Sequence, residues 1–277
     1  MSGHTRPVLR WHGGKYRLAT WIISHLPPHR IYVEPYGGAA SVLMRKQRSY
    51  AEVYNDLDGD VVNLFRVLRD PVTAERLREV VKLTPWSRTE FFESYEVVED
   101  PVERARRTVV RCFMSHGSTS RRANRTGFRA KCFRQNQTGA RDWMGWPEQI
   151  PAFVERLRGV VIECRPALEV IAQQDSPATL FYIDPPYLVE TRTGVKCQSD
   201  RDRAYVHDLD EPDHRELARV LHEIQGMAVV SGYPHPLYDE LYAGWMRVEK
   251  DATVDGGGVR REVLWISPAA ARLELFG

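Results

Sequence analysis

Short apolar runs alternate with amphipathic stretches along most of this 277-residue chain. The runs are rich in β-branched and aromatic residues and end at turn signals, which predicts buried strands. Strands that alternate with helices are typical of a mostly parallel sheet covered on both faces. The predicted strands are 31–33, 50–56, 160–162, 180–183 and 227–231, and the predicted helices include 16–26, 61–68 and 211–224.

The fold class that follows is α/β, with a doubly wound, mostly parallel sheet. Residues 247–266 add two alternating stretches around a run of glycines, which predicts an antiparallel hairpin that completes the sheet. In open sheets of this kind, ligands bind at the carboxyl ends of the strands. The residues that follow each strand are therefore the first candidates for a functional site.

The predicted strand 180–183 ends in Asp184-Pro-Pro-Tyr187. Asp184 and the Pro185 carbonyl can each accept one hydrogen of a planar exocyclic amine, and the rigid prolines fix the direction of that carbonyl. Tyr187 offers a flat face on which a base could stack. Holding both hydrogens would direct the nitrogen lone pair toward an electrophile. The alternative is a simple turn in which Asp184 only shapes the backbone and Tyr187 only packs.

A glycine pair and a lysine, in Trp11-His-Gly-Gly-Lys15, precede the first predicted helix. Gly13 and Gly14 allow a ligand to approach the backbone closely. Lys15 at a helix start is unfavourable against the helix dipole unless it meets an anion, so a carboxylate ligand is expected there. Trp11 could cover the ligand. The alternative is an exposed turn with a solvated lysine.

A second glycine turn, Glu34-Pro-Tyr-Gly-Gly38, connects the strand 31–33 to a helix. Its spacing matches neither a dinucleotide fingerprint nor a Walker loop, which favours a nucleoside-type ligand without phosphates. Asp56 ends the next strand, where an acid typically binds ribose hydroxyls. Asp56 could instead cap a helix, as could Asn55 or Asp58.

Composition narrows the class of protein. The net charge is only +2, so any affinity for nucleic acid must come from local clustering. The four cysteines are widely spaced, which favours reduced thiols in a cytosolic protein over disulfides or a zinc site. The same spacing means that no metal is expected. No apolar run reaches the length of a membrane span, so no membrane is expected either.

Basic residues cluster between Arg104 and Arg141, where ten arginines and one lysine occur without an Asp or Glu. Such a segment would bind phosphates, and arginine and asparagine can also read base edges in a major groove. A solvated basic face is the alternative. The candidate DNA-binding residues are Arg121, Arg122, Asn124, Arg125 and Arg129.

These blocks together resemble the α-group (Dam-like) DNA adenine N6-methyltransferases. Asp213-His214 and Val229-Val-Ser-Gly-Tyr233 extend the resemblance, and the blocks occur in the order of that family. The resemblance implies a Rossmann-like methyltransferase sheet and S-adenosyl-L-methionine as cofactor. It also implies a catalytic domain at 1–70 and 158–277, interrupted at 71–157 by a mainly helical target-recognition domain.

Residue roles follow from the same resemblance. Trp11 and Lys15 would contact the methionine end of the cofactor, and Gly38 would line its loop. Asp56 would hold the ribose, and Asp184 would lie between cofactor and base. Relatives often carry glycine where this chain has Ala40, and often contact the adenine of the cofactor at Cys164 and Arg165. The expected cofactor-binding set is Trp11, Lys15, Glu34, Tyr36, Gly38, Asp56 and Asp184, and the expected catalytic set is Asp184, Pro185, Pro186 and Tyr187.

The function implied is site-specific methylation of adenine N6 in double-stranded DNA. The base would be flipped out and attack the methyl group directly in line, without a metal. Cytosine N4 enzymes more often resemble a Ser-Pro-Pro-Tyr pattern, so Asp184 favours adenine. Methylation of cytosine N4 or of RNA adenine, and an inactive DNA-binding decoy, are the alternatives. The resemblance further implies a cytoplasmic protein of a bacterium or its phage, with no obligate protein partner evident.

Overall fold

The computed structural model describes residues 6–11, 13–116, 127–130, 138–188, 191, 207–253 and 259–274. A seven-stranded sheet forms its centre, with the order β3-β2-β1-β4-β5-β7-β6. The strands are β1 Ile31–Glu34, β2 Ala51–Asn55, β3 Val160–Glu163, β4 Thr179–Ile183, β5 Met227–Gly232, β6 Met246–Thr253 and β7 Val259–Ile266.

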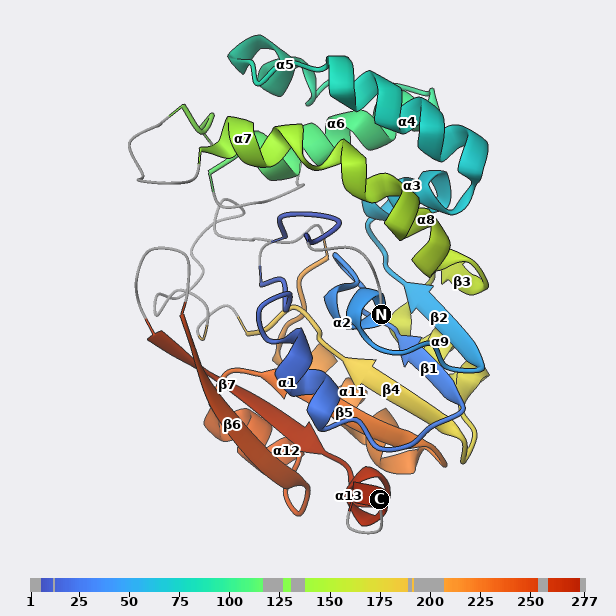
Figure 1. Cartoon of the computed structure of the whole chain (residues 1–277). Coiled ribbons are helices and arrows are strands. Elements are labelled where there is room, and N and C mark those ends of the chain that lie inside the picture. The colour runs from blue at the N-terminus through green and yellow to red at the C-terminus, as the bar shows by residue number, and fades with distance from the viewer. Residues whose placement is uncertain are drawn as a thin grey trace.

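The first five strands along the chain pair in parallel, and β7 and β6 add an antiparallel edge. The predicted α/β class, the mostly parallel sheet and the C-terminal hairpin are thus confirmed. The order and pairing are consistent with a Rossmann-like methyltransferase sheet. The strand order reverses direction between the neighbouring strands β1 and β4 (Figure 1), and in open α/β sheets ligands bind beyond the carboxyl ends of the strands at such a point.

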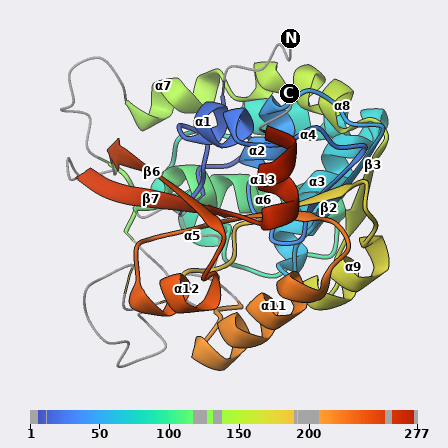
Figure 2. The same ribbon diagram turned by 90° about the horizontal axis from the view of Figure 1, so that it is seen from below.

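Helices cover both faces of the sheet because its central strands are apolar on both sides (Figure 2). Tyr32 and Tyr182 face α1 (Ala19–Ser24), α2 (Ser41–Arg45) and α3 (Gly59–Arg69). Val33 and Phe181, one position along each strand, face the opposite layer. That layer consists of α9 (Ala167–Gln174), α11 (Glu211–Glu223) and α12 (Pro236–Leu241), and α13 (Pro268–Glu274) lies on the α1 side.

Helices make up most of the described chain between β2 and β3. After α3 these are α4 (Pro71–Leu83), α5 (Arg88–Glu93), α6 (Pro101–Met114), α7 (Gly139–Met144), the 3-10 helix η1 (Pro147–Gln149) and α8 (Ile150–Leu157). They gather at one end of the molecule (Figure 1). Their buried residues form one continuous apolar cluster with α1, α2 and α3. The domain boundaries at 70 and 158 stay predictions.

Candidate active site

A cavity of about 350 Å³ lies at the carboxyl ends of β1, β2 and β4. Its walls come from the segment before α1, the turn between β1 and α2, the turn after β2, and the segment that opens α9. The structure therefore brings together every residue of the expected cofactor-binding set, namely Trp11, Lys15, Glu34, Tyr36, Gly38, Asp56 and Asp184. Their individual roles stay predictions.

The turn between β1 and α2 is shaped by close contacts with aromatic rings. Gly38 has a positive φ of 47°, and a Cβ there would lie 2.8 Å from the Trp11 indole nitrogen. A Cβ on Gly37 would lie 2.2 Å from the Tyr54 ring. Ala40 also has a positive φ, 51°, which explains why a glycine suits this position. Ala40 thus keeps the left-handed conformation that a glycine would adopt in this turn.

Asp56 joins two walls of the cavity. Its Oδ2 accepts a hydrogen bond from the Gly38 backbone at 2.8 Å, and its Oδ1 accepts one from the Asp58 backbone at 2.8 Å. Burial raises the pKa of Asp56 to about 6. The cap of α3 is Asp58, whose side chain accepts from the Asp60 backbone. Asp56 is thus not the residue that caps this helix, and each carboxylate oxygen keeps a further lone pair for a ligand hydroxyl.

Asp184 follows β4 and faces the cavity. Ser231 Oγ donates to its Oδ1 at 2.8 Å, Tyr187 donates at 3.0 Å, and Lys15 Nζ lies 3.0 Å away. Among the described residues, all these contacts fall on Oδ1. Oδ2 is therefore the oxygen of this carboxylate that can accept a hydrogen bond from a ligand in the cavity.

Lys15 lies beside this carboxylate rather than at a helix start. Helix α1 begins at Ala19, four residues later, so the expected conflict with the helix dipole does not arise. The buried ammonium, with 4% of its side chain exposed, pairs with Asp184 and donates to the Gly13 carbonyl at 2.8 Å. The sequence-based argument for an anionic ligand was wrong at this step, because the anion that balances Lys15 is in the protein.

Tyr187 is buried, and the expectation of an open stacking face needs qualification. Lys15 Nζ lies 4.6 Å from the ring centroid, and the Tyr233 ring meets it edge-on at 4.8 Å. The Tyr187 hydroxyl contacts Asp184, Ser231 and Glu262. In this geometry Tyr187 fixes the Asp184 carboxylate, and base stacking by Tyr187 stays a prediction.

Several polar residues of the site were not singled out from the sequence. Ser231 lies near the end of β5, inside the block that carried the resemblance, yet no role was assigned to it. Tyr182 alternates with apolar residues in β4 and donates to Ser231 Oγ at 3.2 Å. Glu262 comes from β7, far along the chain, and no local pattern marked it. The segment Pro166–Leu168 lines the cavity in place of Cys164 and Arg165, which precede it.

Glu34 is the other buried acid of the cavity, with 2% of its surface exposed. Its Oε1 accepts hydrogen bonds from Tyr32 and from the Leu43 backbone, both at 2.7 Å. Burial, together with the nearby Asp184 charge, raises the pKa of Glu34 to about 7, although the hydrogen bonds from Tyr32 and Leu43 oppose the shift. Glu34 therefore changes charge near neutral pH.

The candidate DNA-binding residues Arg121, Arg122, Asn124 and Arg125 lie outside the described residues. Arg129 is half-buried, donates to the Phe113 carbonyl at 3.0 Å, and lies over the Trp86 ring at 6.0 Å. This structure places Arg129 against its own protein, and contact with DNA stays a prediction.

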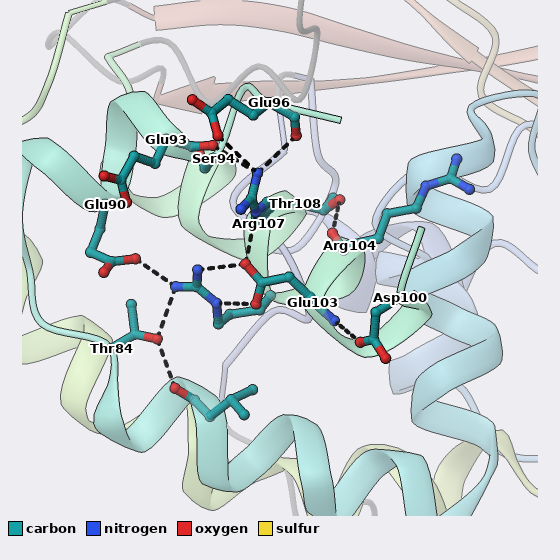
Figure 3. A network of polar contacts seen from close by, with 12 residues as sticks. Thr84, Glu90, Glu93, Ser94, Glu96, Asp100, Glu103, Arg104, Arg107 and Thr108 are labelled. Carbon is teal, nitrogen blue, oxygen red and sulfur yellow. Dashed lines mark hydrogen bonds and ion pairs between the residues drawn. The ribbon is translucent and has the colours of Figure 1, made fainter. Parts of the chain in front are cut away.

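The arginines of α6 show that the charge count along the sequence was misleading. Glu103, just before the basic stretch, binds Arg106 and Arg107 through its two oxygens (Figure 3). Arg104 and Arg111 both pair with Asp60 of α3. Glu103 of α6 itself and Asp60 of α3 thus neutralise these arginines, so the expected basic surface does not include them.

Two further expectations concern metals and membranes. Within the described ranges, no group of three or more His, Cys, Asp or Glu side chains is arranged to hold a metal ion. No helix of the described part is long and apolar enough to cross a membrane.

Comparison with known proteins identifies relatives. Residues 11–254 match the model of the D12 class N6 adenine-specific DNA methyltransferases. Proteins named DNA adenine methylase from Escherichia coli (strain K12), Salmonella typhi and Vibrio cholerae (serotype O1, strain ATCC 39541) are 29%, 27% and 28% identical to the chain. These alignments cover 66% of this chain and 65% of each relative. Because the family model covers most of its length, the chain belongs to the D12 class of N6 adenine-specific DNA methyltransferases.

Proposed function

We propose that this chain transfers a methyl group from S-adenosyl-L-methionine to N6 of adenine in double-stranded DNA. The observation that carries the proposal is the Asp184 carboxylate. Asp184 lines a cavity of nucleoside size, and its Oδ1 contacts Ser231, Tyr187 and Lys15, which leaves Oδ2 for a further hydrogen bond. Membership of the family supports the same reaction.

The residues of the cavity fit the proposed cofactor. Asp56 can accept ribose hydroxyls, and its backbone hydrogen bonds hold it in one orientation. Leu57 and the Pro166–Leu168 segment offer apolar contacts for an adenine ring. Trp11 packs against Gly38 and can cover the methionine end, where Lys15 can contact a carboxylate. When bound, the cofactor supplies the activated methyl group.

The protein contributes orientation of the target amine. A duplex adenine must leave the stack to reach Asp184, at a cost of a few kcal/mol. Asp184 Oδ2 then accepts one N6 hydrogen, and the Pro185 carbonyl is proposed to accept the other. Because Ser231 and Lys15 hold the carboxylate beforehand, little reorganisation is needed when the base arrives.

Recognition of DNA is proposed for residues 71–157, inserted between the catalytic segments 1–70 and 158–277. The described part of this insert is mainly helical. Since the α6 arginines are paired internally, the proposal rests on the basic residues that follow α6. Arg121, Arg122, Asn124, Arg125 and Arg129 are the proposed contacts.

The test is Asp184→Asn, which keeps the shape of the side chain and removes its charge. Purified proteins are incubated with S-adenosyl-L-methionine and unmethylated DNA, and the nucleosides are analysed by mass spectrometry. We expect N6-methyldeoxyadenosine from the wild type, and a rate at least about 100-fold lower from the variant. Binding of DNA and cofactor is measured alongside and should persist.

Asp239→Asn is the matched control, because Asp239 forms an ion pair with Arg247 on the surface, away from the cavity. It should methylate at the wild-type rate. N4-methyldeoxycytidine in the wild-type reaction would reassign the base, and near-normal turnover by Asp184→Asn would refute the role of this carboxylate.

A further inference from the structure

Glu262 is a second carboxylate beside Asp184, supplied by the antiparallel strand β7. It lies one position before Val263, which pairs with Gly232 at the end of β5. This register brings Glu262 to the carboxyl end of the parallel strands, where the candidate site lies. Only 7% of its surface is exposed. A carboxylate buried to this extent requires polar partners.

The contact that links Glu262 to the site is the Tyr187 hydroxyl. Tyr187 has one hydroxyl hydrogen and lies within reach of two carboxylates, Asp184 Oδ1 at 3.0 Å and Glu262 Oε2 at 3.3 Å. Ser231 Oγ lies 3.2 Å away as a third possible acceptor, and the hydrogen can be donated to only one acceptor at a time. Asp184 Oδ1 also accepts a hydrogen bond from Ser231 Oγ and forms an ion pair with Lys15. The two carboxylates therefore compete for the same donor.

Charged groups surround Glu262 from each neighbouring element. Burial raises the pKa of Glu262, the Lys15 ammonium lowers it, and the Asp184 charge raises it. On β7 itself Arg260 lowers this pKa, and Lys250 of β6 is the partner of Glu262 in the strand register. The Lys15 ammonium thus pairs with Asp184 and also lowers the pKa of Glu262, so the charges of these three groups are linked.

We propose that Glu262 is a positioning residue for methyl transfer, acting through Tyr187 on Asp184. This inference rests on the proposed function. Ionised Glu262 draws the Tyr187 hydrogen away from Asp184, so the Asp184 carboxylate is a better acceptor for the substrate amine. Protonated Glu262 donates to the Tyr187 oxygen instead, and Tyr187 then donates to Asp184. The proton on Glu262 comes from solvent and returns to it, so no bond of the substrate changes.

The first test needs neither cofactor nor DNA. Tyrosine is labelled with ¹³C at Cζ, and the Tyr187 resonance is assigned by its loss in Tyr187→Phe. In the wild type we expect this resonance to shift as pH rises through the titration of Glu262. The shift should disappear in Glu262→Gln, because glutamine does not titrate. Glu249→Gln is the matched control, since Glu249 lies on the same hairpin and pairs with Arg247 and Arg261.

The second test measures single-turnover methylation against pH. We expect the wild-type rate to rise with pH as Glu262 ionises. Glu262→Gln should lack this rise and should be about tenfold slower at high pH, the size expected for one hydrogen bond. Its KM for the cofactor and the DNA should be unchanged. In a Tyr187→Phe background, Glu262→Gln should have no further effect, because the transmitting hydroxyl is absent.

The outcomes separate the two proposals. A Tyr187 resonance that ignores Glu262, or equal losses of rate with and without the Tyr187 hydroxyl, would refute the role of Glu262. A purely structural role would instead lower the stability of Glu262→Gln without changing the pH profile. If the NMR shift is present but the wild type methylates no adenine, the hydrogen-bond switch stands and the proposed function fails.

Discussion

At the scale of single residues, Gly37 is the position where the cavity tolerates least change. A Cβ there would lie 2.2 Å from the ring of Tyr54, which is buried and tilted against Phe65. The ring cannot move away without disturbing the core. Gly37→Ala should therefore lower the free energy of unfolding by about 1 to 3 kcal/mol and weaken cofactor binding. Urea unfolding and calorimetric titration with S-adenosyl-L-methionine measure the two effects.

Gly59→Ala provides the comparison for this substitution. Its Cβ would meet only the flexible end of Arg104, at 3.2 Å, and Gly59 opens helix α3. Its stability should stay within about 1 kcal/mol of the wild type. If Gly37→Ala were as stable as Gly59→Ala, the explanation by close packing of the turn against Tyr54 would be refuted.

The sequence allowed prediction of those site residues that directly follow a strand or a glycine turn. Asp184, Asp56 and Gly38 all belong to this kind, and all line the cavity. Glu262 could not be predicted, because its position depends on the pairing of β7 with β5. The partner of Lys15 was equally out of reach, since Asp184 approaches it only through the packing of the whole sheet.

At the scale of elements, helices α3 and α6 are joined by two ion pairs that share the Asp60 carboxylate, one to a buried arginine and one to a partly exposed arginine. Arg111 is fully buried and binds Asp60 Oδ2 at 2.8 Å, while Arg104 binds Oδ1 at 2.6 Å with 36% of its side chain exposed. Arg111→Met leaves a buried carboxylate without this partner and should lower the free energy of unfolding by about 3 to 5 kcal/mol. Chemical denaturation measures this loss.

Arg104→Met removes the other arginine that pairs with Asp60 and serves as the control. Because water screens this exposed pair, the loss should be about 1 kcal/mol or less. Equal losses for the two variants would show that burial does not determine the strength of this junction.

The strands and major helices could be predicted because each carries its own apolar period. The predicted strand 180–183 and the observed β4, for example, differ by a single residue at the start. The surface of α6 could not be predicted in this way. Its arginines are neutralised by Asp60, Glu90 and Glu103, two of which come from other helices, so a count along the sequence misses the pairing.

At the scale of the whole molecule, the buried acids of the cavity link stability to pH. The pKa of Glu34 is raised from 4.5 to about 7, so the folded state binds a proton that the unfolded state releases. Stability should therefore fall as pH rises from about 4.5 to 7, by roughly 1 to 3 kcal/mol. Asp56, raised from 3.8 to about 6, acts in the same direction.

Urea unfolding at pH 5 and at pH 8 measures this change, and Glu34→Gln should reduce it. Acids with a lowered pKa, such as Glu52 and Glu103, have the opposite effect, but only as pH falls below their ordinary value of 4.5. If the wild-type protein were equally stable at pH 5 and at pH 8, the raised pKa assigned to the buried Glu34 would be contradicted.

The pairing of Lys15 with Asp184 also has a consequence for the order of events on the ribosome. These residues lie more than half of the chain apart, and Glu262 follows much later. Such non-local contacts form slowly and only once both partners have been synthesised. A nascent chain can therefore fold its early helices while the group formed by Lys15, Asp184 and Glu262 is still incomplete. This group of charged residues is complete only when β7 has joined the sheet, because β7 supplies Glu262.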